Sequence, residues 1–561
     1  ETNTWSITNN FQIEYRFLTY FRVRGNLQYQ MSKSEAERFR SPNETFFAKT
    51  DADKKGTYTK NSSSNNSITG RLNLTFGRSF GDHTVNGVAG MQFSDKNQES
   101  YGFGAQGYTT DQFSSPNFSS SYVTGKPSAS DSKSRSVSYY FNANYAYNMR
   151  YLIDFNLTTN GASQFGINDP FATTWAVGVG WNVHNEHFLA DSKVINYLKL
   201  RYSLGNPGNQ NYDAKLSSSI YMYNTAYSNP FGLAAWVETW GNNNLKWQRT
   251  VTHNFGLDVQ FFASRLNLNV DYQMRDTDPL LVRIDMPTST GAATAPMNVG
   301  ATDNRSISVR MTYYLIKQRE FNWYISGNLN HNTTKYKKIG NLLQEYNERG
   351  QASASLLRYY DNASTTGVYA VRSAGIDPAT GNEIFIKKDG SYTYEWKQED
   401  EVLIGDSNPK VQGAFQTSLV YKGFTFGASF SYRVGGLTQL STLFNKVENI
   451  SSSQLKYNQD KRALYDRWQK PGDIARFKRI DDTNSTKMSS RFIEKENTFS
   501  CNSINIGYRT TDAEWLKYIG ASAINFTAYM NDIFRISSIK EERGTSYPFE
   551  RSVSFSIGLN F

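Results

Sequence analysis

RSVSFSIGLNF, residues 551–561, closes the chain and decides the fold. From Val553 onward, large apolar residues alternate with small or polar ones, and the chain stops on an aromatic residue. The last residues of a soluble sheet usually fray, so an apolar residue at the very end is unusual. The alternation predicts a β-strand whose outer face meets an apolar medium instead of water. The residues on that face are Val553, Phe555, Ile557, Leu559 and Phe561.

The same period of two recurs along the chain. WSITNNFQIEYRF (from Trp5) and FRVRGNLQYQMS (from Phe21) each place apolar residues on one face and polar residues on the other. Further segments of this kind begin at Ser136, Arg265, Val411 and Ala523. Each runs for about ten residues or a little more, which is the length of a tilted strand that crosses a bilayer.

Composition excludes several classes of protein. Mean hydropathy is -0.61 and no segment approaches the roughly 18 apolar residues of a membrane-spanning helix, while aromatic residues make up 15% of the chain. The single cysteine, Cys501, excludes an internal disulfide framework. The net charge of +10 is dispersed among acidic residues and forms no basic patch, which argues against a nucleic-acid partner.

Connection lengths favour a membrane barrel over a soluble sandwich. Short turns near Thr19, at residues 81–82, 148–149 and 422–423 alternate with long loops, such as those predicted over residues 35–66 and up to about 133. Short turns on the periplasmic side and long loops on the outer side are typical of outer-membrane barrels. The pattern predicts an all-β fold, a transmembrane antiparallel β-barrel with about 17 strands in this chain, located in the bacterial outer membrane as a multi-pass protein.

An odd strand number has a topological consequence. Bacterial single-chain barrels have even strand numbers and begin in the periplasm, so an odd number of strands is expected ahead of Glu1. The sequence also lacks a signal peptide. We therefore expect residues 1–561 to be the C-terminal part of a larger barrel protein.

Several phrases, in order along the chain, resemble the SusC-like TonB-dependent outer-membrane transporters of Bacteroidetes. They are LRYSLGNPGNQ (from Leu200), WGNNNLKWQRT (from Trp240), MNVGATDNRSISV (from Met297), AGIDPATGNEIF (from Ala374), IGDSNPKVQGAF (from Ile404) and DRWQKPGDIARFKRI (from Asp466). The resemblance implies a barrel of about 22 strands, with an N-terminal plug domain and first strands that this chain lacks. It also implies contact with TonB through that missing region, and a SusD-like surface lipoprotein as a lid over the long loops. The implied function is active import of a nutrient, an oligosaccharide or a peptide.

The sequence predicts no enzyme, no cofactor and no metal. GFGAQG (from Gly102) matches G-x-G-x-x-G, but a loop follows it where a phosphate site needs a helix. His184 and His187 have a ligand-like spacing in a short connection without an apparent third ligand. Cys501 has no nearby basic partner, and no Ser/His pair can be assembled for a barrel hydrolase.

The loop between about residues 207 and 249 carries the candidate contacts for cargo or lid. Aromatic rings beside amides and hydroxyls suit sugars, whose C–H faces stack on rings. The same rings could instead pin loops together or form the interfacial girdle. The candidates are Tyr221, Tyr223, Tyr227, Trp236 and Trp240, with Tyr212 in the same loop.

Three further groups of residues receive structural interpretations. Polar residues opposite the apolar face, namely Arg22, Arg24, Asn26, Gln28 and Gln30, are expected to line the lumen. In the long loop from about 437 to 497, we interpret Arg467, Trp468, Pro471, Gly472 and Asp473 as loop architecture. The apolar face of the last strand resembles the signal read by the barrel-assembly machinery, and that strand is expected to close the sheet against strand one.

Two rival functions remain open from the sequence. A passive outer-membrane porin would need no plug, and a secreted soluble all-β carbohydrate-binding protein would be soluble without detergent. The apolar face of a porin would still contact outer-membrane lipid. The apolar face of the soluble protein would not contact lipid.

Overall fold

The structure is a computed structural model that divides into two compact units. Unit 1 comprises Glu1–Val179, Leu204–Thr250 and Leu281–Asn298, and unit 2 comprises Gly180–Ser203, Val251–Leu280 and Val299–Phe561. The residues described are 1–124, 126–163, 168, 170–207, 219–229, 232–246, 248–292, 294–341, 343–352, 355–511, 514–540 and 551–561. No helix in these ranges is long and apolar enough to cross a membrane.

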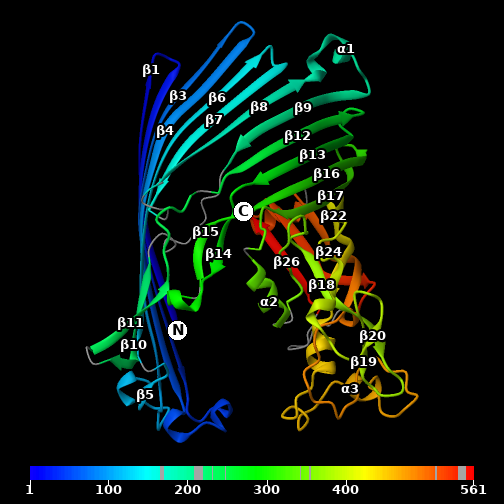
Figure 1. Ribbon diagram of the computed structural model, residues 1–561. Helices are drawn as coiled ribbons and strands as arrows, with labels where there is room; N and C mark the ends of the chain where they lie inside the picture. The colour runs from blue at the N-terminus through cyan, green and yellow to red at the C-terminus, as the bar shows by residue number, and fades with distance from the viewer. Residues whose placement is uncertain are drawn as a thin grey trace. The chain divides into compact units, whose positions relative to one another are not determined.

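Unit 1 is built on long antiparallel strands that pair in the order β1–β2–β3–β4–β6–β7 (Figure 1). Two hairpins, β10–β11 and β14–β15, add small sheets of their own. The strands are β1 (Thr2–Phe17), β2 (Phe21–Arg40), β3 (Thr57–Phe80), β4 (His83–Gln106), β5 (Ser121–Tyr122), β6 (Ser128–Tyr147), β7 (Tyr151–Ala162), β8 (Phe171–Asn182), β10 (Ile220–Asn229), β11 (Gly232–Thr239), β14 (Leu281–Asp285) and β15 (Thr294–Asn298).

Unit 2 contains the C-terminal strands, which pair antiparallel in the order β13–β16–β17–β22–β23–β24–β25–β26. The long strands of this unit are β9 (Ile195–Asn206), β12 (Thr250–Phe261), β13 (Leu266–Thr277), β16 (Ala301–Lys317), β17 (Phe321–Lys337), β22 (Val411–Tyr421), β23 (Phe424–Gln439), β24 (Ile493–Thr510), β25 (Ala523–Ser537) and β26 (Val553–Asn560). With the seven long strands of unit 1, the described residues contain 17, which confirms the predicted all-β class and strand number.

The predicted short turns are present. Leu18 and Thr19 turn the chain between β1 and β2 with φ near +50°, and Asn148 and Met149 do the same between β6 and β7. Gly423, at φ +87°, lies in the turn between β22 and β23, and a Cβ there would meet the carbonyl oxygen of Arg509 at 2.3 Å. Only glycine avoids that contact.

The predicted long loops of unit 1 are wrong in extent. Residues 35–66 were expected as loop, yet β2 continues to Arg40 and β3 begins at Thr57, so the loop covers only residues 41–56. Likewise β4 continues to Gln106, which places GFGAQG at a strand end. The reason is visible in KNSSSNNS (from Lys60): both faces of the sheet are polar there, so the alternation that marks a strand disappears while the backbone ladder continues.

Helical turns occur only between strands in the described residues. The α-helices are α1 (His187–Ala190), α2 (Gln344–Ala352) and α3 (Arg462–Tyr465). The 3-10 turns are η1 (Thr45–Phe47), η2 (Ala52–Lys54), η3 (Pro116–Phe118), η4 (Val183–Asn185), η5 (Thr288–Thr290), η6 (Gln398–Asp400), η8 (Ser490–Phe492) and η9 (Glu514–Ile519), and η7 (Leu443–Glu448) is a π-helix. Four short strands, β18 (Gly367–Ile376), β19 (Glu383–Ile386), β20 (Tyr392–Thr393) and β21 (Glu401–Asp406), form a separate sheet in the order β20–β19–β18–β21.

Candidate functional site: strand faces and loop module

One face of the long strands is apolar and exposed. On β3 it carries Ile68, Leu72 and Leu74, which are between 40% and 49% exposed, and the neighbouring β4 carries Phe93, at 41%. The register places Leu72 beside Met91 and Gly25 on the flanking strands. A contiguous apolar face of this size is unfavourable in water, so this face is suited to lipid.

The end of the apolar face is staggered from strand to strand. On this face the apolar residues end at Met31 on β2, Ile68 on β3, Phe93 on β4 and Val137 on β6, and the next residues on each strand are Lys33, Asn66, Asp95 and Arg135. On β3, the same face is apolar from Ile68 to Phe76 and polar from Asn66 to Lys60. The apolar part matches the roughly 9–11 residues that cross a bilayer in a tilted strand.

Beyond this boundary, unit 1 continues as strands with mostly polar residues on both faces, up to an aromatic cluster of Phe39, Tyr58 and Phe103 at the far end. β3 alone extends from Asn66 back to Thr57, which is about 30 Å of strand at roughly 3.3 Å per residue. Its outer face carries ion pairs, including the cross-strand pair Lys60–Glu37 at 2.6 Å and the pair Lys33–Glu35 along β2 at 2.7 Å. This polar wall is suited to water on both sides.

The opposite face of the strands is polar along its length. Two cross-strand rows, Gln30–Ser67–Lys96–Ser134 and Ser32–Asn65–Gln98–Ser132, line a pocket in unit 1. Amide and hydroxyl groups dominate these rows. This is the face on which Arg22, Arg24, Asn26, Gln28 and Gln30 were predicted, and their alternation with the apolar residues of β2 is present in the pairing register.

Charged residues on the polar face neutralise one another. In unit 1, Arg24 donates two hydrogen bonds to Glu14, with Nη2–Oε2 at 2.6 Å. In unit 2, Arg201 binds Asp258 and also reaches Asp271 at 3.1 Å. A polar pocket on strands β17 and β22–β25 contains Arg433 and Arg535, which both approach Glu496, at 3.4 and 2.8 Å. Pairing lowers the cost of placing these charges in a partly buried site.

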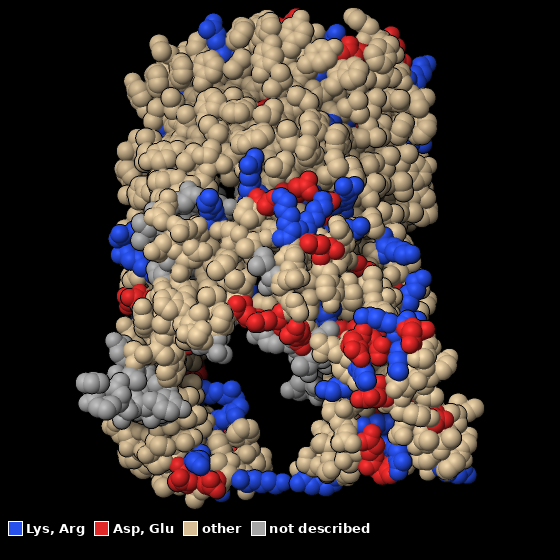
Figure 2. All heavy atoms as spheres, in the orientation of Figure 1, with Lys and Arg blue, Asp and Glu red and all other residues tan. Residues whose placement is uncertain are grey.

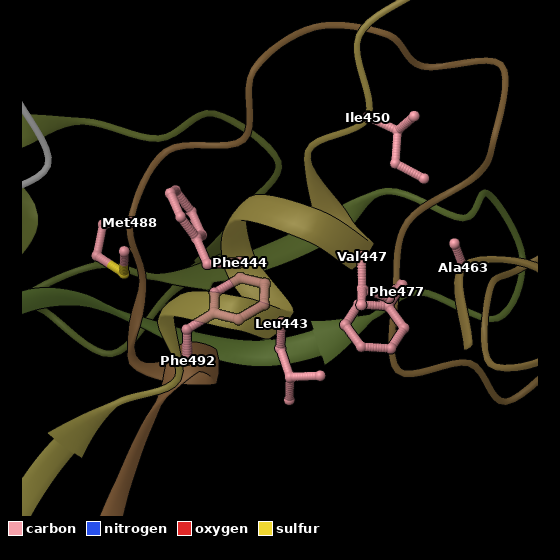
Figure 3. Close-up of a cluster of buried hydrophobic side chains, with 8 residues drawn as sticks. All are labelled: Leu443, Phe444, Val447, Ile450, Ala463, Phe477, Met488 and Phe492. Carbon is pink, nitrogen blue, oxygen red and sulfur yellow. The ribbon is translucent and has the colours of Figure 1, made fainter. Parts of the chain in front are cut away.

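Two long loops of unit 2 fold into a compact loop module, defined here as residues 355–410 and 440–495. Its core is a cluster of buried side chains shown in Figure 3. The rings of Phe444 and Phe492 meet edge to face in this cluster, with their centroids 5.2 Å apart. The cluster consists of Leu443, Phe444, Val447, Ile450, Ala463, Phe477, Met488 and Phe492. Because these loops bury their own apolar side chains, they form a folded element instead of extended connections.

A buried ion network holds the same module together. Arg491 donates to Glu448 at 2.6 Å and to Glu383 at 2.8 Å, and all three side chains are at most 9% exposed. Burial opposes the charge of Arg491, but the two carboxylates outweigh burial and raise its pKa. Arg467 is also buried and donates to backbone carbonyls, including those of Ala463 and Lys478.

The phrases AGIDPATGNEIF and DRWQKPGDIARFKRI meet in the module. The indole Nε1 of Trp468 donates to the carbonyl of Pro378 at 2.9 Å, and the amide of Gly472 donates to the same carbonyl. A Cβ on Gly381, whose φ is +73°, would lie 2.6 Å from the Trp468 ring. These contacts support the architectural interpretation of Trp468 and Gly472, and they explain why the first phrase carries glycine at this position.

The module gives a pH prediction at Asp460. The Arg462 guanidinium binds Asp460 and lowers the pKa of that carboxyl from 3.8 to about 2, while the Arg462 amide donates to the same side chain at the start of α3. Because the folded-state pKa is depressed, this stabilisation is complete above pH 3.8 and is lost as the pH falls from 3.8 towards about 2. We expect the protection of the amides of residues 462–466, measured against the intrinsic exchange rate at each pH, to fall across that window, and to be low already at neutral pH in Asp460→Asn. Unchanged exchange in the variant would contradict the assignment.

Most carboxylates of the module accept an internal hydrogen bond or ion pair, and most of its lysines have no carboxylate partner. Among the described residues of the module, Glu399 and Asp466 are the carboxylates without an internal hydrogen bond or ion pair. Nine lysines have no carboxylate within 4.0 Å: Lys387, Lys388, Lys410, Lys446, Lys456, Lys461, Lys470, Lys487 and Lys495. Figure 2 shows charged side chains gathered over the part of unit 2 that carries β18–β20 and α3 in Figure 1.

The predicted aromatic contacts fall on the β10–β11 hairpin and just after it. Tyr221 is 59% exposed and Trp236 is 37% exposed, so both are accessible to a ligand. Trp240 instead donates from Nε1 to the carbonyl of Thr290 at 3.0 Å, next to hydrogen bonds that join residues 242–246 to β15, so it has a role in holding the loop. Tyr223 lies in β10 beside Ala235, and Tyr227 lies in the same strand. The side chains of both, and all of Tyr212, are outside the described residues.

The weaker motifs of the sequence, at His184 and Cys501, lie in structural surroundings. His184 contacts the carbonyl of Leu198 at 3.1 Å and packs on Tyr197, in the connection between β8 and β9. In the part of the chain that the structure describes, no three His, Cys, Asp or Glu side chains gather as a metal site would require. Cys501 is 1% exposed in β24. The non-enzymatic role remains a prediction.

The last strand forms as predicted. β26 pairs with β25, with Phe555 opposite Ala528 and Leu559 opposite Ile524. Val553, Phe555, Ile557, Leu559 and Phe561 are all exposed, from 43% at Leu559 to 84% at Phe561. The apolar face is therefore available to lipid or to an assembly partner, and recognition by the barrel-assembly machinery stays a prediction.

The sequence of this chain is similar to those of several known proteins. The chain is 29% identical over 388 residues to TonB-dependent receptor P3 of Formosa agariphila, covering 65% of this chain and 38% of that protein. It is 26% identical over 446 residues to TonB-dependent receptor SusC of Bacteroides thetaiotaomicron, covering 76% and 43%. The chain is a relative of the SusC-like TonB-dependent receptors. It spans less than half the length of these relatives, and no protein-family model matches it.

Solved structures agree with this relationship at the level of fold. The whole chain superposes on 62% of the RagAB peptide transporter chain, with a TM-score of 0.85 at 18% identity. The same complex in an "open-open" state gives a TM-score of 0.84. The pyoverdine receptor FpvA of Pseudomonas aeruginosa gives a lower TM-score of 0.51. The apolar strand face, the polar opposite face and the loop module thus belong to a fold like that of the RagAB peptide transporter chain.

Proposed function

We propose that this chain is the barrel part of an outer-membrane importer that takes up an oligosaccharide or a peptide, is driven through TonB and works with a SusD-like surface lipoprotein. The observation that carries the proposal is the superposition of the entire chain on the RagAB peptide transporter, because it includes the loop module and not the strands alone. The sequence relationship to SusC supports the same reading.

The physical features of the chain are consistent with such a role. The apolar face suits lipid, and the amide- and hydroxyl-rich opposite face suits a hydrated lumen. Residues 1–561 are then the C-terminal part of a longer protein, and the plug domain and TonB-contacting segment would lie in the remaining length that the relatives possess. The site of action is the outer membrane of a bacterium.

Energy dependence tests the proposal directly. Uptake of a fluorescent oligosaccharide or peptide library would be measured in cells that carry the full-length protein, with and without a functional TonB protein. Import should stop when TonB is absent or when the inner-membrane proton gradient is dissipated. A passive porin, the main rival, would continue to pass small solutes under both conditions, and that result would overturn the proposal.

A further inference from the structure

One face of unit 1 carries almost no charge over a block of five neighbouring strands, which we call the neutral wall. Of its 25 positions, 16 are Ser or Thr, six are Asn or Gln, and Lys96 is the one charged residue; the structure describes all of them. The pairing register aligns these residues in cross-strand rows. The wall consists of every second residue in Thr2–Asn10 of β1, Gln28–Ala36 of β2, Asn61–Thr69 of β3, Ser94–Gly102 of β4 and Ser128–Ser136 of β6.

The other face of the same strand segments shows that this composition is specific to the wall. The residues that alternate with the wall residues number 20, and seven of them are charged: Lys33, Glu35, Asp95, Glu99, Asp131, Lys133 and Arg135. A surface that meets water typically has about a quarter to a third of charged residues. The other face has this share and the wall does not, so exposure to water does not account for the wall.

The neutral composition is also confined along the strands. Nearer the short turns, the same face of β1 and β2 is charged: Glu14 accepts hydrogen bonds from Arg24, and Arg16 lies directly opposite Arg22. The wall lies at the end of the apolar band and beyond it, towards the longer connections of residues 41–56 and 107–127. In an outer-membrane barrel this is the side that opens to the cell exterior.

Most side chains of the wall are available to a ligand. Those with a hydrogen-bond partner in the described structure are Thr4 and Ser34, whose hydroxyls lie 3.0 Å apart, and Ser128, which donates to the carbonyl of Gly102. A pocket of about 320 Å³ opens in the wall, and among its described lining residues Lys96 alone is charged. This volume is at the lower end of the range for small-molecule sites.

An uncharged polyhydroxylated chain matches these groups. Hydroxyl and amide side chains both donate and accept hydrogen bonds, as sugar hydroxyls do. Each contact therefore exchanges bonds to water for bonds to the wall at a small net change in free energy. A charged chain would instead give up water for a surface that offers no carboxylate and a single ammonium group, so its charges would remain uncompensated.

We propose that the neutral wall is a contact surface for the cargo and that the cargo is an uncharged oligosaccharide. The inference rests on the proposed function, which leaves oligosaccharide and peptide open, and it selects between them by the chemistry of the wall. Weak hydrogen bonds that repeat along the rows allow a sugar chain to change partners as it moves, without being held at one position.

The test compares three size-matched sets of probes on the full-length protein, purified in detergent and immobilised. The first set is a mixture of neutral oligosaccharides from partly hydrolysed glucan, mannan and galactan. The second is the same mixture after oxidation of its primary hydroxyls to carboxylates, and the third is a random peptide library. Mass spectrometry identifies the retained molecules.

Two double variants are compared with the wild type. Ser63→Lys with Asn65→Lys places two cations on the wall. Ser62→Lys with Ser64→Lys is the matched control, because these residues alternate with the first pair on β3 and lie on the other face. The heat-dependent shift on an unboiled gel verifies that each variant is folded.

We expect the wild type to retain the neutral set at least about 10-fold better than the oxidised set or the peptides, since only the neutral set avoids uncompensated charge. The wall variant should lower the ratio of neutral to oxidised molecules by about 10-fold, because two ammonium groups attract carboxylates. The control should stay within about 2-fold of the wild type, since its charges lie on the other face.

The outcomes separate this inference from the proposed function. Retention of peptides or oxidised sugars as well as neutral ones by the wild type, or retention of no neutral sugar, would overturn the inference. An equal shift in the wall and control variants would also overturn it, because the added charge would then act without contact at the wall. Uptake that continues without TonB would overturn the proposed function and leave the measured preference for neutral sugars unchanged.

Discussion

Replacing Arg491 with methionine is expected to unfold the loop module while the strands remain assembled. The substitution removes the cation but leaves Glu448 and Glu383 buried, at 0% and 6% side-chain exposure. Removing one partner of a buried ion pair costs about 3–5 kcal/mol because the remaining charge is uncompensated. The module has a single small apolar core, so a loss of this size should open it locally.

Limited proteolysis of the full-length protein measures this effect. We expect cleavage between residues 440 and 495 to become faster by about 100-fold or more in Arg491→Met, which is the factor that corresponds to about 3 kcal/mol. Arg476→Met is the matched control, because Arg476 pairs with Glu494 at 3.0 Å but both side chains are at least 41% exposed. An exposed pair contributes at most about 1 kcal/mol, so the control should resist protease as the wild type does. Equal resistance of both variants would mean that the buried network does not stabilise the module.

A charge placed in the apolar band of β3 is expected to block assembly into the membrane. Leu72 lies in the middle of the apolar part of that strand and is 49% exposed. An arginine facing lipid at the bilayer midplane costs about 2–4 kcal/mol, and the cost falls towards zero at the interfaces. Leu72→Arg should therefore reduce the amount of folded protein in the outer membrane.

Ser64→Arg provides the matched control for this position. Ser64 lies on the same strand and the same face as Leu72, but beyond Ile68, where the apolar part of β3 ends, and between Lys33 and Glu99 of the neighbouring strands. We expect its folded yield, judged by the heat-dependent shift of the barrel on an unboiled gel, to equal that of the wild type. If the two variants behave alike, the outer face of β3 does not meet lipid where the structure indicates.

The sequence was sufficient to predict the strands that have one apolar and one polar face. Alternation in residues 5–17 and 411–421 gave β1 and β22 with nearly their observed bounds, and the short turn at residues 422–423 was placed correctly. These features are local, because a period of two follows from the pleat of a single strand. The strand number followed from them.

The polar extensions of β2, β3, β4 and β6 could not be predicted in the same way. In residues 59–67 both faces carry polar residues, so no alternation remains, and Ser and Asn are typical of loops. What holds these segments as strands is their pairing, for example Ser64 with Lys33 and with Glu99, and that information lies in distant parts of the chain.

The same distinction between local and long-range sequence information applies to the candidate site. Tyr221 and Trp236 were predicted from composition and are exposed, whereas Trp240, selected on the same grounds, bonds to Thr290. The pocket that Tyr360 and Leu403 line was not predicted, because these residues are 43 apart in the sequence and only the pairing of β18 with β21 brings them together.

The central claim is that the apolar face of β3 meets lipid from Ile68 to Phe76 and that the same face from Asn66 to Ser62 stands in water. Its most direct test is a scan of single cysteines along β3 of the protein in outer membranes, at positions 62, 64, 66, 68, 72 and 74, labelled with a membrane-impermeant maleimide. Cys501, the one cysteine of residues 1–561, is 1% exposed and gives a low background. We predict rapid labelling at 62–66 and protection at 68–74. Uniform labelling along the strand would contradict the claim.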